Sequence, residues 1–150
     1  MKTSDAVGML LKAKGHYTVL SIAPDKFVYE AIGLMAEHDI GALLVLNGSD
    51  LVGILSERDY ARKGVLLGHA SKETEVAQIM TTPVISVTPQ HTVDECMALM
   101  TQHRIRHLPV LRDNSVIGVI SIGDLVKWVI SGQAQTIEAL HGYIAGAYPA

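Results

Sequence analysis

The chain has 150 residues, of which 49% are hydrophobic, and its formal net charge is −3 at pH 7. This length allows one ordinary core or two half-sized repeats that share one, and the negative charge offers no basic field for a phosphate backbone, so nucleic-acid binding is not expected. The single cysteine, Cys96, excludes an internal disulfide, and no segment reaches the roughly 18 uninterrupted apolar residues of a membrane span, so we expect a cytoplasmic protein without a membrane partner.

Residues 19–60 and 84–125 are two copies of one passage, in register at a spacing of 65 without a gap. Most positions that agree are apolar, as packing alone would require. A glycine, a serine and an aspartate also recur, as Gly53-x-x-Ser56-x-x-Asp59 and Gly118-x-x-Ser121-x-x-Asp124. A polar trio kept in both copies indicates two related sites.

The predicted elements begin with a helix at residues 4–13, ahead of the first copy, and a short strand at 19–22. After Pro24, apolar residues recur at i, i+3, i+4 and i+7, which is the spacing of a helix with one buried face. The second copy repeats a strand at 84–87 and the same helix, for which Thr92 and Glu95 form a capping box. Phe27 holds the place of Thr92 in the first copy and cannot cap its helix.

Two apolar runs, at residues 42–46 and 51–55, then flank Asn47-Gly48, a pair that tolerates the positive backbone angles of a tight hairpin. The second copy has matching runs at residues 107–111 and 116–120, around Asp113-Asn114. Their nearly continuous apolar character predicts strands that are covered on both faces. A further helix is expected to open near Ser56 and near Ser121, so each copy reads strand, helix, strand, strand, helix.

A unit of about 45 residues is too small to bury both faces of its sheet alone. We therefore predict an α/β (α+β) fold in which two βαββα copies pack about a pseudo-twofold axis. The predicted segments are an N-terminal helical extension at 1–17, the first copy at 18–66, a linker at 67–82 with a helical turn near 76–80, the second copy at 83–131, and a C-terminal extension at 132–150 that is helical at 133–145.

The recurring trio suits a nucleotide. Gly53 lies within a strand, where glycine often marks the close approach of a backbone or a ligand, and would leave room for a sugar. Ser56 holds the N-cap position of the next helix, whose free N–H groups attract phosphate, and Asp59 can accept both hydroxyls of a ribose. Arg58, Arg62 and Lys63 add positive charge to the first copy, where the second has Gly123, Lys127 and Trp128.

The alternative is that Ser-x-x-Asp is only a helix-capping signature, which is the more frequent role of such a pattern. The matched glycine, the recurrence and the neighbouring cations favour a binding site. Both interpretations stay open at this point.

Three longer segments carry a family resemblance: Gly-Ile-Leu-Ser-Glu-Arg-Asp-Tyr-Ala-Arg-Lys at 53–63, Arg-Ile-Arg-His-Leu-Pro-Val at 104–110, and Gly-Val-Ile-Ser-Ile-Gly-Asp-Leu-Val at 118–126. With the linker pair Met80-Thr81, they resemble the cystathionine-β-synthase-type (CBS) domain pair over residues 18–130. The resemblance implies a βαββα fold for each copy, a paired unit called a Bateman module, frequent homodimers, and adenosine-containing ligands in clefts between the two sheets.

Carried over to this sequence, the resemblance implies that Asp59 and Asp124 hold ribose, with Ser56 and Ser121 near ribose or phosphate. The adenine would be surrounded by Thr18, Gly41, Ala42, His107, Leu108 and Pro109. Arg106 and His107 match positions that reach phosphate in this family. The first copy has Gly41 and Ala42 there and would rely on Arg58 and Arg62, while Gly123 stands at the place of Arg58 in the second.

No catalytic group emerges beside these residues. His103 and His107 are four apart, but the repeat puts His107 on a strand, which argues against a helical metal site. We therefore expect a non-enzymatic regulatory module, a homodimer that binds AMP, ATP or NAD(H), needs no catalytic cofactor or metal, and acts on an unknown partner protein. The alternatives are a scaffold whose sites stay empty and an enzyme acting on a nucleotide, for which no general base or activated nucleophile is visible.

Overall fold

The computed structural model of the protein describes residues 2–15 and 19–132. The chain forms two compact units. The first-copy unit combines Thr18–Ser86 and Asp113–Ile117, and the second-copy unit combines Met1–Tyr17, Val87–Arg112 and Gly118–Ala150. The linker therefore belongs to the first-copy unit, whereas the N-terminal segment belongs to the second-copy unit. The helix predicted at 133–145 lies outside the described residues.

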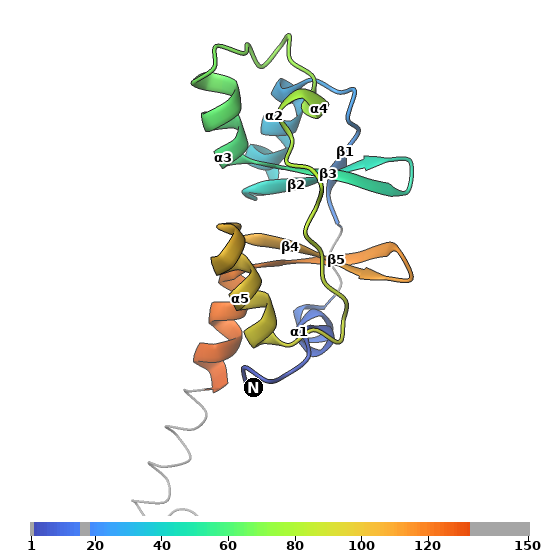
Figure 1. The fold of residues 1–150 in the computed structure, drawn as a ribbon, viewed down its shortest axis with the longest axis vertical. Helices are drawn as coiled ribbons and strands as arrows, with labels where there is room; N and C mark the ends of the chain where they lie inside the picture. The colour runs from blue at the N-terminus through green and yellow to red at the C-terminus, as the bar shows by residue number, and fades with distance from the viewer. Residues whose placement is uncertain (1, 16–18, 133–150) are drawn as a thin grey trace, which may run out of the picture. The chain divides into compact units, whose positions relative to one another are not determined.

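The first-copy unit is a three-stranded sheet with helices α2, α3 and α4 on one face (Figure 1). Its elements in chain order are β1 (Ser21–Ile22), α2 (Val28–His38), β2 (Ala42–Asn47), β3 (Asp50–Ser56), α3 (Glu57–Asp59), the π-helix η1 (Tyr60–Val65) and α4 (Val76–Ile79). The central strand β2 pairs in parallel with β1 and antiparallel with β3.

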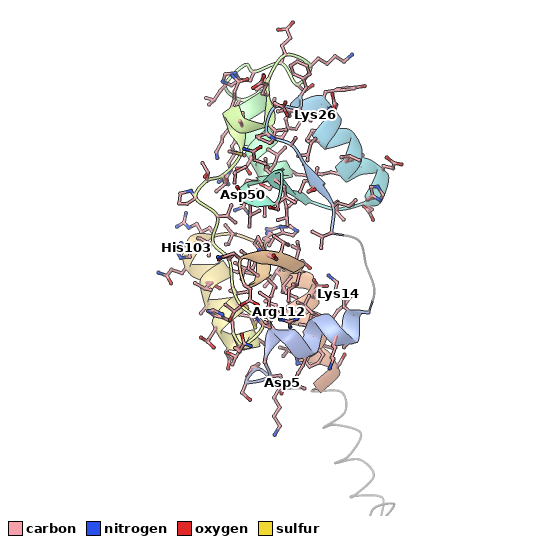
Figure 2. The ribbon with its side chains drawn as sticks, turned by 90° about the vertical axis from the view of Figure 1, so that its right-hand side faces the viewer. Asp5, Lys14, Lys26, Asp50, His103 and Arg112 are labelled. Atoms are coloured by element: carbon pink, nitrogen blue, oxygen red, sulfur yellow. The ribbon has the colours of Figure 1, made fainter. Side chains whose placement is uncertain are left out.

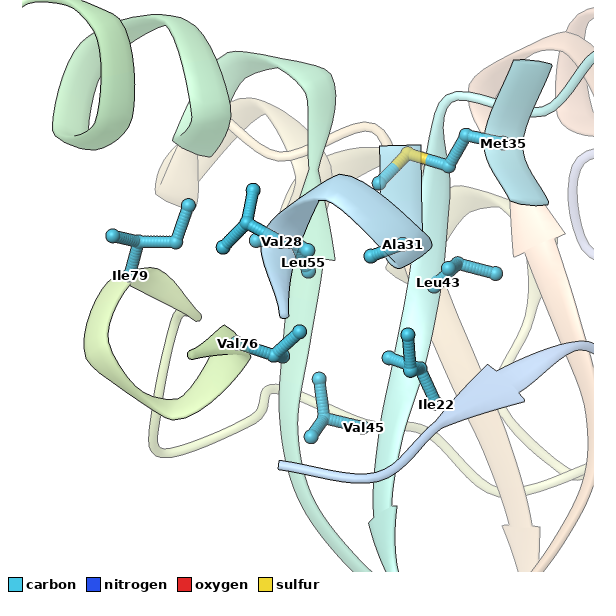
Figure 3. Packing of buried hydrophobic residues seen from close by; sticks show 9 residues of the cluster. All are labelled: Ile22, Val28, Ala31, Met35, Leu43, Val45, Leu55, Val76 and Ile79. Carbon is cyan, nitrogen blue, oxygen red and sulfur yellow. The ribbon is translucent and has the colours of Figure 1, made fainter. Parts of the chain in front are cut away.

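The core of this unit lies between the sheet and its helices (Figure 3). The predicted apolar face of α2 is confirmed, because Val28, Ala31 and Met35 are each at most 2% exposed. The linker helix α4 adds Val76 and Ile79, which are also fully enclosed. Each large apolar side chain buried in this way stabilises the fold by about 1.5–3 kcal/mol, so the linker contributes to the stability of the first copy.

The second-copy unit repeats this plan around a two-stranded sheet, with a single bridge from Val87 to Val110 in place of the third strand. Its elements are α1 (Val7–Lys14), α5 (Val93–His103), β4 (His107–Arg112) and β5 (Ser115–Ser121), followed by helical residues 122–132. The bounds of α2 and α5 differ by the repeat spacing at both ends, and β2 and β4 share the same order of buried and exposed residues. None of the described helices is long and apolar enough to cross a bilayer.

Helices α1 and α4 occupy equivalent places in the two units. The Val7 N–H donates to the carbonyl of His91 at 2.8 Å, and the Val76 N–H donates to the carbonyl of Lys26 at 2.8 Å. His91 and Lys26 are matched positions of the two copies. The segment that precedes each copy in sequence therefore packs against the other copy, an exchange that the repeat alone does not reveal.

Several local predictions need correction. The strand predicted at 19–22 is only two residues long, and the one at 84–87 is reduced to a single bridge from Val87 to Val110. The turn of the first hairpin lies one residue later than predicted. It consists of Gly48, with φ 65°, and Ser49, because Asn47 still pairs within β2. The turn at Asp113-Asn114 is confirmed, with φ of 50° and 64°.

The prediction that the strands are covered on both faces is confirmed only in part. Three consecutive residues are buried in β2 and again in β4, as expected of strands covered on both faces. In β3 and β5, buried residues alternate with half-buried ones instead. The N-terminal helix begins at Val7, three residues later than predicted.

Candidate functional site

Both Ser-x-x-Asp motifs are helix N-caps. In the first, the Ser56 hydroxyl accepts the Asp59 N–H at 3.1 Å, and the Asp59 carboxylate accepts the Ser56 N–H at 2.9 Å through Oδ2. In the second, the Ser121 hydroxyl and the Asp124 carboxylate make the same two contacts, at 3.1 and 2.9 Å. The capping interpretation is therefore confirmed for both copies. A capping aspartate can also bind a ligand, because a carboxylate has two oxygens with about four lone-pair sites.

The residue before each second strand completes the cap. The carbonyl of Gly41 accepts the Glu57 N–H at 3.0 Å, and the carbonyl of Arg106 accepts the Ile122 N–H at 2.9 Å. These two carbonyls fix the direction in which each helix leaves its hairpin. Gly41 and Arg106, predicted to touch a ligand, thus lie at the first helical turn of their own copy.

The carboxylate of Asp59 is enclosed. Besides the two groups of Ser56 on Oδ2, its Oδ1 accepts the Thr81 hydroxyl at 2.9 Å and pairs with the Lys63 ammonium at 3.2 Å. Thr81 is held there by a two-way backbone pairing with Ile54 in β3. Only 8% of Asp59 is exposed. The first motif therefore uses its aspartate to anchor the linker to the helix start.

The room beside Gly53 is filled by the linker. A Cβ at Gly53 would overlap Sδ of Met80 and lie 2.9 Å from its Cγ. The prediction that this glycine leaves space for a sugar is wrong for the first copy, because the thioether side chain packs onto its backbone. The close approach inferred from a glycine within a strand is real, but it is made by another part of the protein.

The carboxylate of Asp124 has a different partner, Lys14 at the end of α1. The Lys14 ammonium lies 2.9 Å from Oδ2 of Asp124 and also donates to the carbonyl of Val119 at 3.3 Å. The side chain of Asp124 is 18% exposed, compared with 10% for that of Asp59. The second carboxylate is thus more open to solvent than the first.

Electrostatics favours the charged form of Asp124. Burial alone would raise its pKa, but the hydrogen bond from the Ser121 backbone, the Lys14 ammonium and the Ser121 hydroxyl together outweigh burial and lower the pKa below its usual range. At neutral pH the second motif therefore presents a carboxylate, the form that accepts hydrogen bonds from a sugar.

Lys14 replaces two groups of the first motif. In the first copy, the Ile54 carbonyl accepts the Thr81 N–H at 2.8 Å, and Lys63 supplies the cation beside the aspartate. The matching residues of the second copy are Val119 and Trp128, and Trp128 instead donates its indole N–H to Asp5 at 3.0 Å. In the second copy, the Lys14 ammonium from α1 therefore contacts both the Val119 carbonyl and the Asp124 carboxylate. In the first copy, the corresponding contacts are made by Thr81 of the linker and by Lys63.

The other site residues predicted in the first copy lie at the start of β2 and in the helical segment after Ser56. Ala42 opens β2 opposite Ser56, Arg58 lies in α3, and Arg62 is exposed on η1. Thr18 lies outside the described residues.

The helix predicted to open near Ser56 is present, but it changes from α3 to the π-helix η1 after Asp59. Within η1 the Leu66 N–H donates to the carbonyl of Ala61, five residues back, at 3.1 Å. A Cβ at Gly64 would lie 2.9 Å from the Tyr60 ring, so this packing needs glycine, whereas the second copy has Val129 and an ordinary α-helix.

In the second copy, His107 opens β4 as predicted, and Pro109 is buried within it with its carbonyl accepting the Val87 N–H at 3.0 Å. Pro109 therefore serves sheet pairing. Arg106, which precedes β4, and Gly123, in the helical residues after β5, are exposed beside the cap of Ser121. The structure brings Arg106, Ser121, Gly123 and Asp124 together around one helix start.

Sequence reasoning missed Lys14 and the contacts of Met80 and Thr81 with the first motif. Two signals were available. Trp128 stands where the first copy has Lys63, so the cation four residues after the first aspartate has no counterpart four residues after the second. In addition, the buried pair Val7 and Leu10 has the spacing of Val76 and Ile79, which marks α1 and α4 as equivalent.

Comparison with known proteins decides the family. The sequence profile of the CBS domain matches twice, over residues 16–65 and 76–131. The chain belongs to the CBS-domain family. The CBS domain-containing protein CBSX3 of Arabidopsis thaliana, a mitochondrial protein, is 40% identical over 153 residues, which cover 97% of this chain and 74% of the relative.

Solved structures agree with this CBS pair. A candidate signal-transduction protein with CBS domains from Burkholderia ambifaria MC40-6 is 55% identical, with a TM-score of 0.82, over 85% of this chain and 96% of that one. A hexameric CBS-CP12 protein from bloom-forming cyanobacteria is 32% identical, with a TM-score of 0.67, over 73% of this chain and 65% of that one. The α+β fold predicted from the sequence is thereby confirmed.

CBS pairs are generally regulatory, ligand-binding modules, and most are not enzymes. Proteins of this family bind adenosine ligands and often assemble into oligomers. Membership therefore gives the broad class of function, while the ligand and its position have to be argued from the residues.

Proposed function

We propose that this CBS pair is a regulatory sensor of an adenosine-containing ligand, AMP, ATP or NAD(H), and that the ribose is held by Asp124 of the second motif. The observation that carries this proposal is the difference between the two carboxylates. Both carboxylate oxygens of Asp59 have partners, which come from Ser56, Thr81 and Lys63. Asp124 has its cap contacts with Ser121 and an ion pair with Lys14 of α1.

The chemistry around Asp124 suits such a ligand. A ribose has two adjacent hydroxyls, and a charged carboxylate accepts hydrogen bonds about twice as strong as those between neutral groups. The carboxylate stays charged because its pKa is lowered by the Ser121 amide and by Lys14 against the raising effect of burial. Arg106 and Gly123 lie at the same helix start and offer a cation and an open backbone near a phosphate.

The proposed sensor has further properties that were expected from the sequence. The protein acts without catalysis, needs no metal or catalytic cofactor, forms a homodimer, and passes ligand binding on to a partner protein. Cytoplasmic residence, expected from the sequence, also stays a prediction.

Calorimetry tests the proposal. Protein freed of nucleotide is titrated with AMP, ATP and NAD, and we expect binding of at least one of them with a dissociation constant in the micromolar to millimolar range. The variant Asp124→Asn keeps the shape of the cap and should bind that ligand at least about tenfold more weakly, because a charged hydrogen-bond acceptor is lost. Absence of heat with all three ligands up to millimolar concentration would refute the sensor function.

A structural role is the second candidate for the first motif. Asp59 joins the helix start to the linker through Thr81, and Met80 fills the space beside Gly53. If nucleotide binding depends on Asp124 but not on Asp59, one copy senses and the other holds the linker. Binding that requires Asp59 alone would reverse this assignment.

A further inference from the structure

Lys14 contacts a residue 110 positions further along the chain. It lies at the C-terminal end of α1, and Asp5 lies ahead of the other end (Figure 2). Its ammonium is 2.9 Å from Oδ2 of Asp124, and its side chain is 33% exposed. The contact joins the N-terminal helix to the carboxylate on which the proposed function depends.

Donors already fill the oxygen that Lys14 uses. A carboxylate oxygen has about two lone pairs, and Oδ2 of Asp124 accepts from the Ser121 N–H at 2.9 Å and from Lys14 at 2.9 Å. A ribose that donates one hydroxyl to each carboxylate oxygen needs a lone pair of Oδ2. The Ser121 N–H is fixed by the strand and helix on either side of it, whereas the ammonium of Lys14 sits on a flexible four-carbon stem.

We propose that Lys14 is a latch: its contact with Asp124 and a nucleoside held by Asp124 exclude each other, so that ligand binding releases the last turn of α1. This inference rests on the proposed function at Asp124. By linkage, the factor by which docked Lys14 weakens ligand binding equals the factor by which the ligand weakens docking of Lys14.

In the part of the chain that the structure describes, the first motif makes no equivalent contact with a terminal helix. Lys63, the cation beside Asp59, lies four residues along the same helical segment, so its release moves no separate element. Thr81 is held by backbone pairing with Ile54 on both its N–H and its carbonyl. Within residues 2–15 and 19–132, only the carboxylate of the second motif is paired with a lysine of a terminal helix.

The release is confined to the end of α1. Val7 and Leu10 are at most 4% exposed, and the N–H groups of Val7 and Gly8 donate to His91 and Pro89 at 2.8 and 2.9 Å. These contacts do not involve Asp124 and stay in place when Lys14 leaves. The last turn, residues 11–14, is the part that ligand binding sets free.

The variant Lys14→Met tests the latch, with Lys12→Met as its matched control. Lys12 lies in the same last turn, is exposed, and carries the same charge. Titrated with AMP by calorimetry, Lys14→Met should bind about fivefold more tightly than wild type, as expected when a partly exposed ion pair no longer competes. Lys12→Met should bind like wild type.

Hydrogen exchange gives a second readout. AMP should speed the exchange of amides 11–15 in wild type and in Lys12→Met, whereas in Lys14→Met these amides should exchange fast without AMP and not change further. If Lys14→Met binds AMP as tightly as Lys12→Met or more weakly, the latch is refuted while the sensor function stands. If wild type and both variants bind none of AMP, ATP and NAD, the sensor function fails and the latch with it.

Discussion

The two motif aspartates differ in what surrounds their carboxylates. Asp59 has a buried side chain with donors from Ser56, Lys63 and Thr81, and displacing them would cost several hydrogen bonds at once. Asp124 keeps the same cap but receives its cation from a flexible lysine. A repeated motif can therefore keep its local geometry while its two aspartates have different partners and different exposure.

The ion pair of Asp124 gives a pH-dependent stability. The folded-state pKa of Asp124 is lower than the ordinary 3.8, so its contribution is fully present above pH 3.8 and is lost as the pH falls through the folded pKa. We expect Asp124→Asn to lower the free energy of unfolding at pH 7 by about 1 kcal/mol. Urea unfolding of both proteins between pH 7 and pH 3 measures the difference, which should shrink at the acidic end. A difference that grows on acidification would contradict the assignment.

Cys96 is predicted to be inert. It is fully buried on the apolar face of α5, and burial, with a smaller effect of the Glu95 charge, raises the pKa of its thiol to about 11. Because the thiolate is the reactive form, iodoacetamide at pH 8 should modify the folded protein very slowly. The urea-unfolded chain is the control and should react at the rate of a free cysteine. Equally fast modification of the folded protein would show that Cys96 is accessible.

Elements predicted from local patterns agree with the structure. Helices α2 and α5 have the predicted apolar faces, and the capping box of Thr92 and Glu95 is present with hydrogen bonds of 3.1 and 3.2 Å. Apolar spacing and cap residues act within a few neighbouring positions, so the sequence contains what decides them. The α+β class and the two capped motifs could be predicted for the same reason.

Contacts between distant segments could not be predicted in this way. The pairing of Lys14 with Asp124 and the packing of Met80 on Gly53 depend on which copy each preceding segment joins. The π-helix after Asp59 depends on the Tyr60 ring lying against Gly64. The equal apolar spacing of α1 and α4 marks the two helices as equivalent but specifies none of these contacts, and each contact changes how a predicted site residue is used.

The packing of the linker on β3 can be tested through Gly53. A methyl group there meets Met80 at less than 3 Å, so Gly53→Ala should lower the free energy of unfolding by about 1–3 kcal/mol. The cost should be smaller in a Met80→Ala background, because the obstructing side chain is gone. Urea unfolding of the single and double variants gives the coupling energy. Strictly additive effects would mean that Met80 does not occupy this space in solution.

At the scale of the whole molecule, duplication has produced two units with one plan and unequal motifs. Each unit takes its additional helix from the segment that precedes the other copy, α4 in the first and α1 in the second. The α1 contact ends in a lysine at the second carboxylate, whereas α4 leads into a backbone pairing of Thr81 with Ile54. Under the proposed function, the second motif holds the ligand and the first motif supports the linker.

Assembly is a prediction at the same scale. The family often forms oligomers, and we expect a homodimer. Light scattering should give twice the chain mass of 16.1 kDa at micromolar concentration. A mass of one chain, unchanged by AMP, would contradict the dimer without affecting the ribose assignment.

Recognition of a ribose by Asp124 is the central claim. The most direct test is calorimetry that compares the binding of AMP with that of 2′-deoxy-AMP. It is carried out on wild type, on Asp124→Asn and on the matched control Asp59→Asn. Wild type and Asp59→Asn should bind AMP about tenfold more tightly than the deoxy compound, since one charged hydrogen bond is lost. Asp124→Asn should bind both weakly and with little preference. Equal binding of the two nucleotides by wild type, or an Asp124→Asn variant that keeps the preference, would contradict the account.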